Sequence, residues 1–161
     1  MEKIIHKEMS YKLGGLFFKT HNDLGRFRKE YQYCKHFEGL LKNSNISYVR
    51  EYKINSPDKA LNKVDFFIEN AILVDFKAKP FITREDYYQM RRYLELVGLD
   101  LGLIVNFRQK YLKPKRVLNS KSTSSIRSIR INSYFRIILI DSHCHPQFPQ
   151  YDSDREEVIK R

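Results

Sequence analysis

The chain has 161 residues, of which 42% are hydrophobic and 14% aromatic, and this composition excludes a disordered protein and predicts one globular domain with a proper core. Its formal net charge of +11 favours an anionic partner, of which nucleic acid is the commonest. No stretch approaches the roughly 18 apolar residues of a membrane-spanning helix, and the first residues lack the apolar core of a signal peptide. Cys34 and Cys144 are too few for a disulfide framework. We therefore expect a soluble, cytoplasmic protein with reduced thiols.

The first half of the chain predicts two helices followed by three strands. Hydrophobic residues recur at helical spacing in the first two segments, and the next three are apolar or alternating runs. Glu69-Asn70 is a tight connection that suits a hairpin between the last two strands. In chain order, the expected elements are helices over residues 10–24 and 28–42 and strands over residues 46–54, 63–68 and 71–77.

A third helix and a buried strand follow. Thr83 is suited to be an N-cap, with Asp86 three residues later, and an apolar stripe runs from Tyr87 to Val97. Gly98 is expected to end this helix, and the almost wholly apolar run over 101–107 predicts a strand covered on both faces. The order of elements predicts an α/β or α+β protein in three layers.

Two of the apolar strands each carry a carboxylate. Asp65 lies within Lys63–Ile68, and Asp75 is followed two residues later by Lys77, so that alternation places Asp75 and Lys77 on one face. Burying such charges costs several kcal/mol unless a cation or a metal compensates them. The spacing alone leaves two interpretations open. One is a metal-dependent phosphodiesterase with a divalent ion between the carboxylates, and the other is a half-buried hairpin with an ion pair.

Three further polar residues fit with this pair. Glu30 lies on the second expected helix, and Gln89 and Tyr93 are one turn apart on the third, where positions i and i+4 share a face. Taken singly, Glu30 is equally a solvated helix acid, Gln89 a surface amide and Tyr93 a core residue.

Together these residues resemble the PD-(D/E)XK nuclease superfamily, and within it the branch named for its GxxExxY pattern. The resemblance covers roughly residues 8 to 118, with five motifs in the same order and spacing. The matching stretches are Leu24–Tyr33, Val64–Ile68, Leu73–Ala78, Gln89–Leu94 and Gly98–Phe107. The chain departs from the pattern at Phe27, where the family has glycine, so that the loop before Glu30 must follow another path. It also has Asp75-x-Lys77 where the branch usually has Glu-x-Lys.

The resemblance implies a restriction-endonuclease-like core, in which helices flank a central mixed sheet, and roles for particular residues. Asp65, Asp75 and Glu30 would bind Mg²⁺, or alternatively Mn²⁺, together with the backbone carbonyl of Phe76. Lys77 would position or deprotonate the attacking water and neutralise charge on the phosphorane. Gln89 and Tyr93 would hold the substrate phosphate. The expected partner is nucleic acid, with DNA favoured over RNA. The alternative is a basic binding module that keeps the nuclease fold without turnover.

The C-terminal part differs in character. Residues 108–136 contain many Lys and Arg and no acid, which indicates either a solvated flexible face or contacts with a phosphate backbone. We divide the chain into a nuclease-like domain over 1–118, a Ser-rich basic linker over 119–134 and a tail over 135–161. The tail, with His143 and His145 after an apolar run, resembles the first strand of TatD-type metal-dependent deoxyribonucleases. That barrel needs about 250 residues, so a working second site is not expected.

Overall fold

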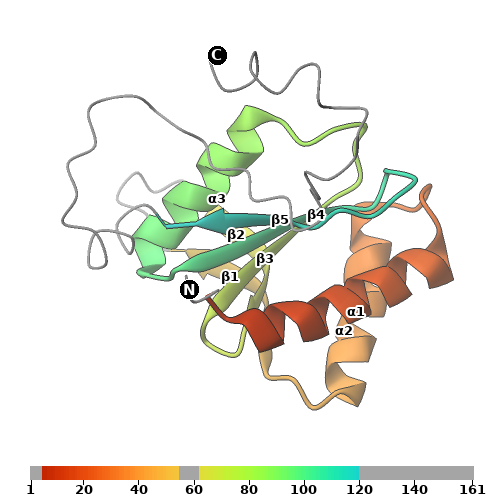
Figure 1. Cartoon of the computed structure of the whole chain (residues 1–161), viewed down its shortest axis with the longest axis horizontal. Coiled ribbons are helices and arrows are strands. Elements are labelled where there is room, and N and C mark those ends of the chain that lie inside the picture. The colour runs from red at the N-terminus through yellow and green to blue at the C-terminus, as the bar shows by residue number, and fades with distance from the viewer. Residues whose placement is uncertain (1–4, 55–61, 120–161) are drawn as a thin grey trace, which may run out of the picture.

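The computed structural model describes residues 5–54 and 62–119, which form five strands and three helices (Figure 1). The helices are α1 (Lys7–Leu24), α2 (Glu30–Asn43) and α3 (Arg84–Val97), and the strands are β1 (Tyr48–Ile54), β2 (Asn62–Ile68), β3 (Ile72–Lys77), β4 (Leu101–Asn106) and β5 (Lys115–Leu118). The proposed linker from residue 120 onward and the TatD-like tail lie outside the described residues.

One mixed sheet forms the middle layer, with its strands in the order β1-β2-β3-β4-β5. Neighbouring strands are antiparallel except β3 and β4, which are parallel and are joined through α3. Helices α1 and α2 cover one face and α3 covers the other (Figure 1). The expected three-layer α+β fold of the restriction-endonuclease type is therefore confirmed. In the described part of the chain, no helix has the length and apolar character needed to cross a membrane.

Aromatic rings dominate the core between the sheet and the first two helices. Phe17 of α1 stacks on Phe37 of α2 with ring centroids 4.9 Å apart, and Phe76 of β3 contacts both rings edge-on or at an angle. Tyr33 of α2 stacks on Phe107 at 4.3 Å, directly after β4. All five side chains are fully buried. This packing fixes the first turn of α2, which carries Glu30, against the ends of β3 and β4.

Helix α3 begins and ends where its sequence predicts. The backbone N–H of Thr83 donates to Oδ2 of Asp86 at 2.7 Å, and the Thr83 hydroxyl contacts the same oxygen at 3.1 Å. Gly98 ends the helix in the left-handed conformation, at φ 69°. Because such a conformation strains any residue with a Cβ, glycine is the natural choice there.

Strand β5 is an element that the sequence pattern did not reveal. It pairs antiparallel with β4, from Leu101–Leu118 to Ile104–Lys115. Its residues, Lys-Arg-Val-Leu, show no apolar alternation, and only Val117 is buried. Arg116 nonetheless belongs to the packed domain, because its guanidinium donates to Oγ of Ser10 and to the carbonyl of Ile5, each at 2.6 Å.

The β1–β2 pair changes face in the middle. Phe66 and Ile68 pack with α1 and α2, whereas Val64, which is two residues before Phe66 and should point the same way, packs with α3. The change occurs at Glu51 and Asp65, where the regular pairing of β1 and β2 is interrupted, and Glu51 there has a φ of 52°. An irregularity of this kind re-aims side chains locally.

Candidate active site

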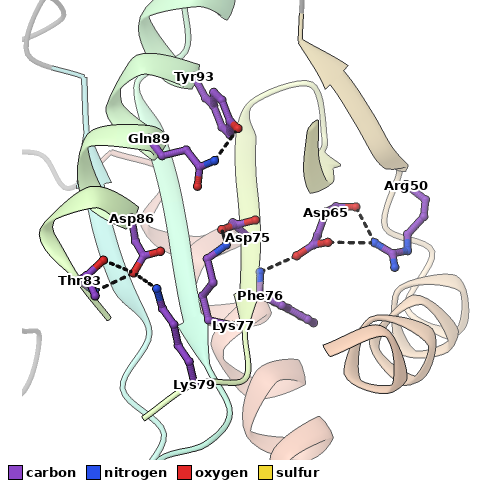
Figure 2. A network of polar contacts seen from close by, with 10 residues as sticks. All are labelled: Arg50, Asp65, Asp75, Phe76, Lys77, Lys79, Thr83, Asp86, Gln89 and Tyr93. Carbon is purple, nitrogen blue, oxygen red and sulfur yellow. Dashed lines mark hydrogen bonds and ion pairs between the residues drawn. The ribbon is translucent and has the colours of Figure 1, made fainter. Parts of the chain in front are cut away.

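Asp75 and Lys77 lie on the α3 face of β3, as the alternation predicts (Figure 2). Their side chains are 13% and 18% exposed, and Nζ of Lys77 lies 2.5 Å from Oδ2 of Asp75. Opposite them, in the parallel pair with β4, stand Ile104 and Asn106. The two charged groups are thus largely removed from water and neutralise each other.

Burial dominates the electrostatics of this pair. It raises the pKa of Asp75 to about 6, although Lys77 opposes the change and the nearby Asp65 adds to it. Burial works against the charged form of Lys77, but contact with Asp75, helped by Glu30, outweighs it and raises the pKa of the amine. Lys77 is therefore a cation at neutral pH.

Asp65 lies in the opening between β2 and β3. The pairing of these strands ends at Phe66–Val74, and Asp65 and Asp75 occupy the next position, where the strands have separated. Oδ2 of Asp65 accepts a hydrogen bond from the backbone N–H of Phe76 at 2.7 Å, which replaces the missing main-chain partner (Figure 2). Nη1 of Arg50 lies 3.5 Å from Oδ1 of Asp65 and also donates a hydrogen bond to the backbone carbonyl of Asp65 at 3.0 Å.

Glu30 begins α2 on the opposite side of the sheet from α3 and keeps an exposed surface. Its pKa is raised to about 7, first by burial of the carboxyl and next by the negative charge of Asp65, while Lys77 opposes the change. Asp75 and Lys79 also act on it, in opposite directions. The structure thus brings Glu30 within electrostatic reach of all the charged groups expected at the site.

Gln89 and Tyr93 share one face of α3. Nε2 of Gln89 donates to the Tyr93 hydroxyl at 2.8 Å, and Figure 2 shows both on the side of β3 that carries Asp75. Tyr93 is 4% exposed, whereas Gln89 is exposed. Burial raises the pKa of Tyr93, with a smaller contribution from Asp75. Gln89 is thus the member of the pair that a solvent-borne substrate can reach.

The sequence did not indicate three further residues at this site. Arg50 balances the charge of Asp65, and Lys79 pairs with Asp86 at 2.5 Å. The amide of Asn106, 2% exposed, donates to the carbonyl of Lys79 at 2.7 Å and accepts from its N–H at 3.3 Å. Lys79 had a signal, since it continues the alternation Asp75-x-Lys77-x-Lys79. No sequence pattern pointed to Arg50, because its contact with Asp65 depends on the interrupted pairing of β1 and β2 at Glu51 and Asp65.

Comparison with protein families assigns the chain to a superfamily. The profile described as "PD-(D/E)XK nuclease superfamily" matches residues 7–117, which is more than half of the chain. The chain belongs to this superfamily.

Among solved structures, the chain is similar to an alkaline exonuclease from Laribacter hongkongensis. The identity is 12%, the TM-score is 0.40, and the match covers 78% of this chain and 76% of that one. A comparison with curated protein sequences finds no match.

Because the chain belongs to the PD-(D/E)XK superfamily, we ask whether its acidic residues could bind a divalent ion. Their donors are the hard carboxylate oxygens that such ions prefer. The pKa values of Asp75 and Glu30 are raised first by burial, so the ionised form of each carboxyl lacks part of the hydration it has in water. As they stand, however, no three His, Cys, Asp or Glu side chains among the described residues are gathered closely enough to hold one ion. The chemistry of the donors fits a metal, while Asp75 is satisfied here by Lys77.

Proposed function

We propose that this chain hydrolyses phosphodiester bonds of nucleic acid with the help of a divalent ion, Mg²⁺ or alternatively Mn²⁺. The observation that carries the proposal is the pair Asp75 and Lys77 on one face of β3, beside Asp65 in the opening between β2 and β3. Membership of the PD-(D/E)XK nuclease superfamily supports the same chemistry. The assignment to the GxxExxY branch, the preference for DNA over RNA and a cytoplasmic location are parts of this proposal.

Asp65, Asp75 and Glu30 are the residues that would hold the ion, with the carbonyl of Phe76 as a further donor. When bound, the ion supplies activation of water and stabilisation of negative charge on the phosphoryl group. The protein's contribution is to position these groups. The hydrogen bond from Phe76 N–H fixes the orientation of the Asp65 carboxylate, and the core packing of α2 fixes Glu30.

Lys77 contributes as a cation. Its pKa is raised, above all through contact with Asp75 once the opposing effect of burial is overcome, so the amine keeps its proton at neutral pH. A fixed ammonium group in a water-poor site stabilises charge that develops on the phosphoryl oxygens in the transition state. It also positions the attacking water by donating a hydrogen bond. Gln89, exposed beside Asp75, would bind the substrate phosphate, and Tyr93 would orient Gln89.

A second candidate function is a nucleic-acid-binding module without turnover. The observation that favours it is the state of the carboxylates, since Asp75 is neutralised by Lys77 and Asp65 by Arg50 and Phe76 N–H. A site satisfied in this way needs no metal to be stable.

Replacing one carboxylate separates the two functions. We expect Asp75→Asn to abolish Mg²⁺-dependent cleavage of labelled single- and double-stranded DNA and RNA, because the ligand charge is lost. Binding of the same substrates in EDTA should stay within about twofold, since a carboxylate such as Asp75 does not itself bind phosphate and the cations that do are unchanged. Asp100→Asn, in the turn between α3 and β4, is the matched control and should cleave like the unaltered protein.

Absence of cleavage by the unaltered protein with Mg²⁺ or Mn²⁺, together with intact binding, would select the binding module. Cleavage that survives in Asp75→Asn would place the chemistry elsewhere in the chain.

A further inference from the structure

Two loops meet at the end of the sheet where β3 and β4 finish. One joins α1 to α2 over residues 25–29, and the other follows β4 over residues 107–114; Figure 1 shows them side by side. The imidazole of His21 lies 3.0 Å from the carbonyl of Gln109, which ties the end of α1 to the second loop. The first loop leads directly into Glu30, so whatever binds to it lies next to the candidate site.

Phe27, at the tip of the first loop, is 74% exposed. The guanidinium carbons of Arg26 and Arg108, one from each loop, lie 5.1 and 5.6 Å from the centre of its ring. These cations approach the ring and still leave most of it open. An exposed ring with two cations beside it offers a flat apolar face next to positive charge, which suits a ligand with both a flat apolar face and negative charge.

The backbone of this loop is fixed rather than adaptable. The buried Tyr33 hydroxyl donates to the carbonyl of Gly25 at 2.7 Å and accepts from the N–H of Arg28 at 3.1 Å, which brackets Phe27 on both sides. Gly25 takes the positive φ of 68° that the loop requires, so Phe27 itself is unstrained although the family pattern has glycine at its position. A ring on a rigid loop binds with little loss of conformational freedom.

The charge around Phe27 is of one sign. The two loops carry Arg26, Arg28, Lys29, Arg108, Lys110 and Lys113 and no acid. Within the described residues, none of these six forms a salt bridge. Tyr111, 70% exposed with Nζ of Lys110 at 5.3 Å, repeats the pairing of aromatic ring and cation. Proteins that bind single strands use surfaces of this kind, in which aromatic rings stack on bases and cations contact phosphates.

We propose that Phe27 is a stacking platform for an unpaired base, and that the chain acts on single strands or single-stranded ends. The proposal rests on the proposed function for the class of ligand. It requires no metal, because both the ring and the cations belong to the chain. Inside a duplex both faces of each base are covered by its neighbours, so the contribution of the ring is confined to unpaired nucleotides and to the terminal pairs of a duplex.

The test is a binding cycle in EDTA between the ring and a base. We expect Phe27→Ala to weaken binding of a short labelled single strand roughly tenfold, while binding of a long duplex, in which terminal pairs are a small fraction of the binding sites, changes by less than about twofold. Phe27→Trp should restore single-strand affinity. Tyr11→Ala is the matched control, since Tyr11 is 86% exposed near the start of α1, about 20 Å along the helix from the loop, and should have no effect.

An oligonucleotide of abasic residues completes the cycle. The unaltered protein should bind it at least roughly tenfold more weakly than the normal strand, whereas Phe27→Ala should discriminate between the two strands roughly tenfold less than the unaltered protein does. The proposal is overturned if Phe27→Ala weakens single strand and duplex alike, or if it has no effect. Both readouts are equilibria without metal, so failure of Asp75-dependent cleavage leaves this test intact.

Discussion

At the scale of single residues, the site holds carboxyl groups whose ionised form is disfavoured by burial. Asp75 and Glu30 come from opposite faces of the sheet, and both have a raised pKa, in each case first through burial. Lys77 is the cation that acts on both. Burial therefore makes both carboxyl groups take up protons at a higher pH than they would in water.

These raised pKa values predict how stability depends on pH. The folded protein holds protons on Asp75 up to about pH 6 and on Glu30 up to about pH 7, whereas the unfolded chain releases them near 3.8 and 4.5. Because the folded state binds more protons in this window, the free energy of unfolding should fall as pH rises through it. We expect a loss on the order of 2 kcal/mol between about pH 5 and about pH 8, measured by urea unfolding in EDTA.

The variant Glu30→Gln/Asp75→Asn removes both titrations and should show a flatter curve. Excess Mg²⁺ should flatten the curve of the unaltered protein by binding the ionised carboxylates. Parallel curves for the protein and the double variant in EDTA would contradict the assignment.

Residues in regular structure were the ones that the sequence could place. Alternation put Asp75 and Lys77 on one face because β3 is a regular strand, and helical spacing paired Gln89 with Tyr93 for the same reason. Alternation could not show that Asp65 fills the gap between two strands, since this depends on where their pairing ends. The position of Phe27 at the tip of a loop held by Tyr33 likewise depends on tertiary contacts.

At the scale of elements, the contact between α3 and β4 sets the height of Gln89 and Tyr93 above the sheet. Gly102 of β4 lies directly beneath Met90 of α3, and a Cβ at that position would stand 2.5 Å from Sδ and 2.6 Å from Cγ of Met90. The side chain of Leu94 is the next neighbour, at 3.4 Å. The helix thus approaches the strand as closely as glycine permits.

Gly102→Ala tests this contact. Met90 must move, and because it is a flexible side chain the expected loss in the free energy of unfolding is about 1 to 2 kcal/mol. Met90→Ala alone should cost about 2 to 3 kcal/mol through the space it leaves. The pair should cost less than the sum of the two single changes, as measured by chemical denaturation. Additive losses would show that the two residues do not contact each other.

The order of helices and strands followed from hydrophobic periodicity, except for β5. Two of the four residues of this strand are cationic, and their pairing with β4 comes from backbone hydrogen bonds rather than from an apolar stripe. A short edge strand of this kind carries no periodic signal. The change of face in β1 and β2 was also hidden, because Val64, Phe66 and Ile68 satisfy one regular alternation in the sequence.

At the scale of the whole molecule, the basic character belongs mostly to the part that the structure describes. Residues 120–161 contain seven Lys or Arg and five Asp or Glu, so most of the net charge of +11 lies before them. Asn119, with which our proposed linker begins, is 6% exposed, and its amide donates to the carbonyl of Leu99 at 3.0 Å. Its N–H also donates to the carbonyl of Asp100 at 3.0 Å.

These contacts predict where the chain can be shortened. A protein of residues 1–119 should keep the fold and most of the salt dependence of nucleic-acid binding, since it keeps the cations. Asn119→Ala in that shortened chain should lower the free energy of unfolding by about 1 to 2 kcal/mol, because buried carbonyls lose their donor. Circular dichroism during thermal unfolding measures whether the 1–119 protein folds and how much stability Asn119→Ala removes. Failure of the 1–119 protein to fold would move the domain boundary beyond residue 119.

The change of face in the β1–β2 ribbon has a mechanical consequence. Phe66 and Ile68, in one half of this two-stranded ribbon, pack with α1 and α2. Val64 and Ile54, in the other half, pack with α3. Asp65 lies at the point where the ribbon passes from one of these packing layers to the other. The carboxylate of Asp65 is therefore held in place by elements from both layers, so its position depends on the packing of each side of the sheet.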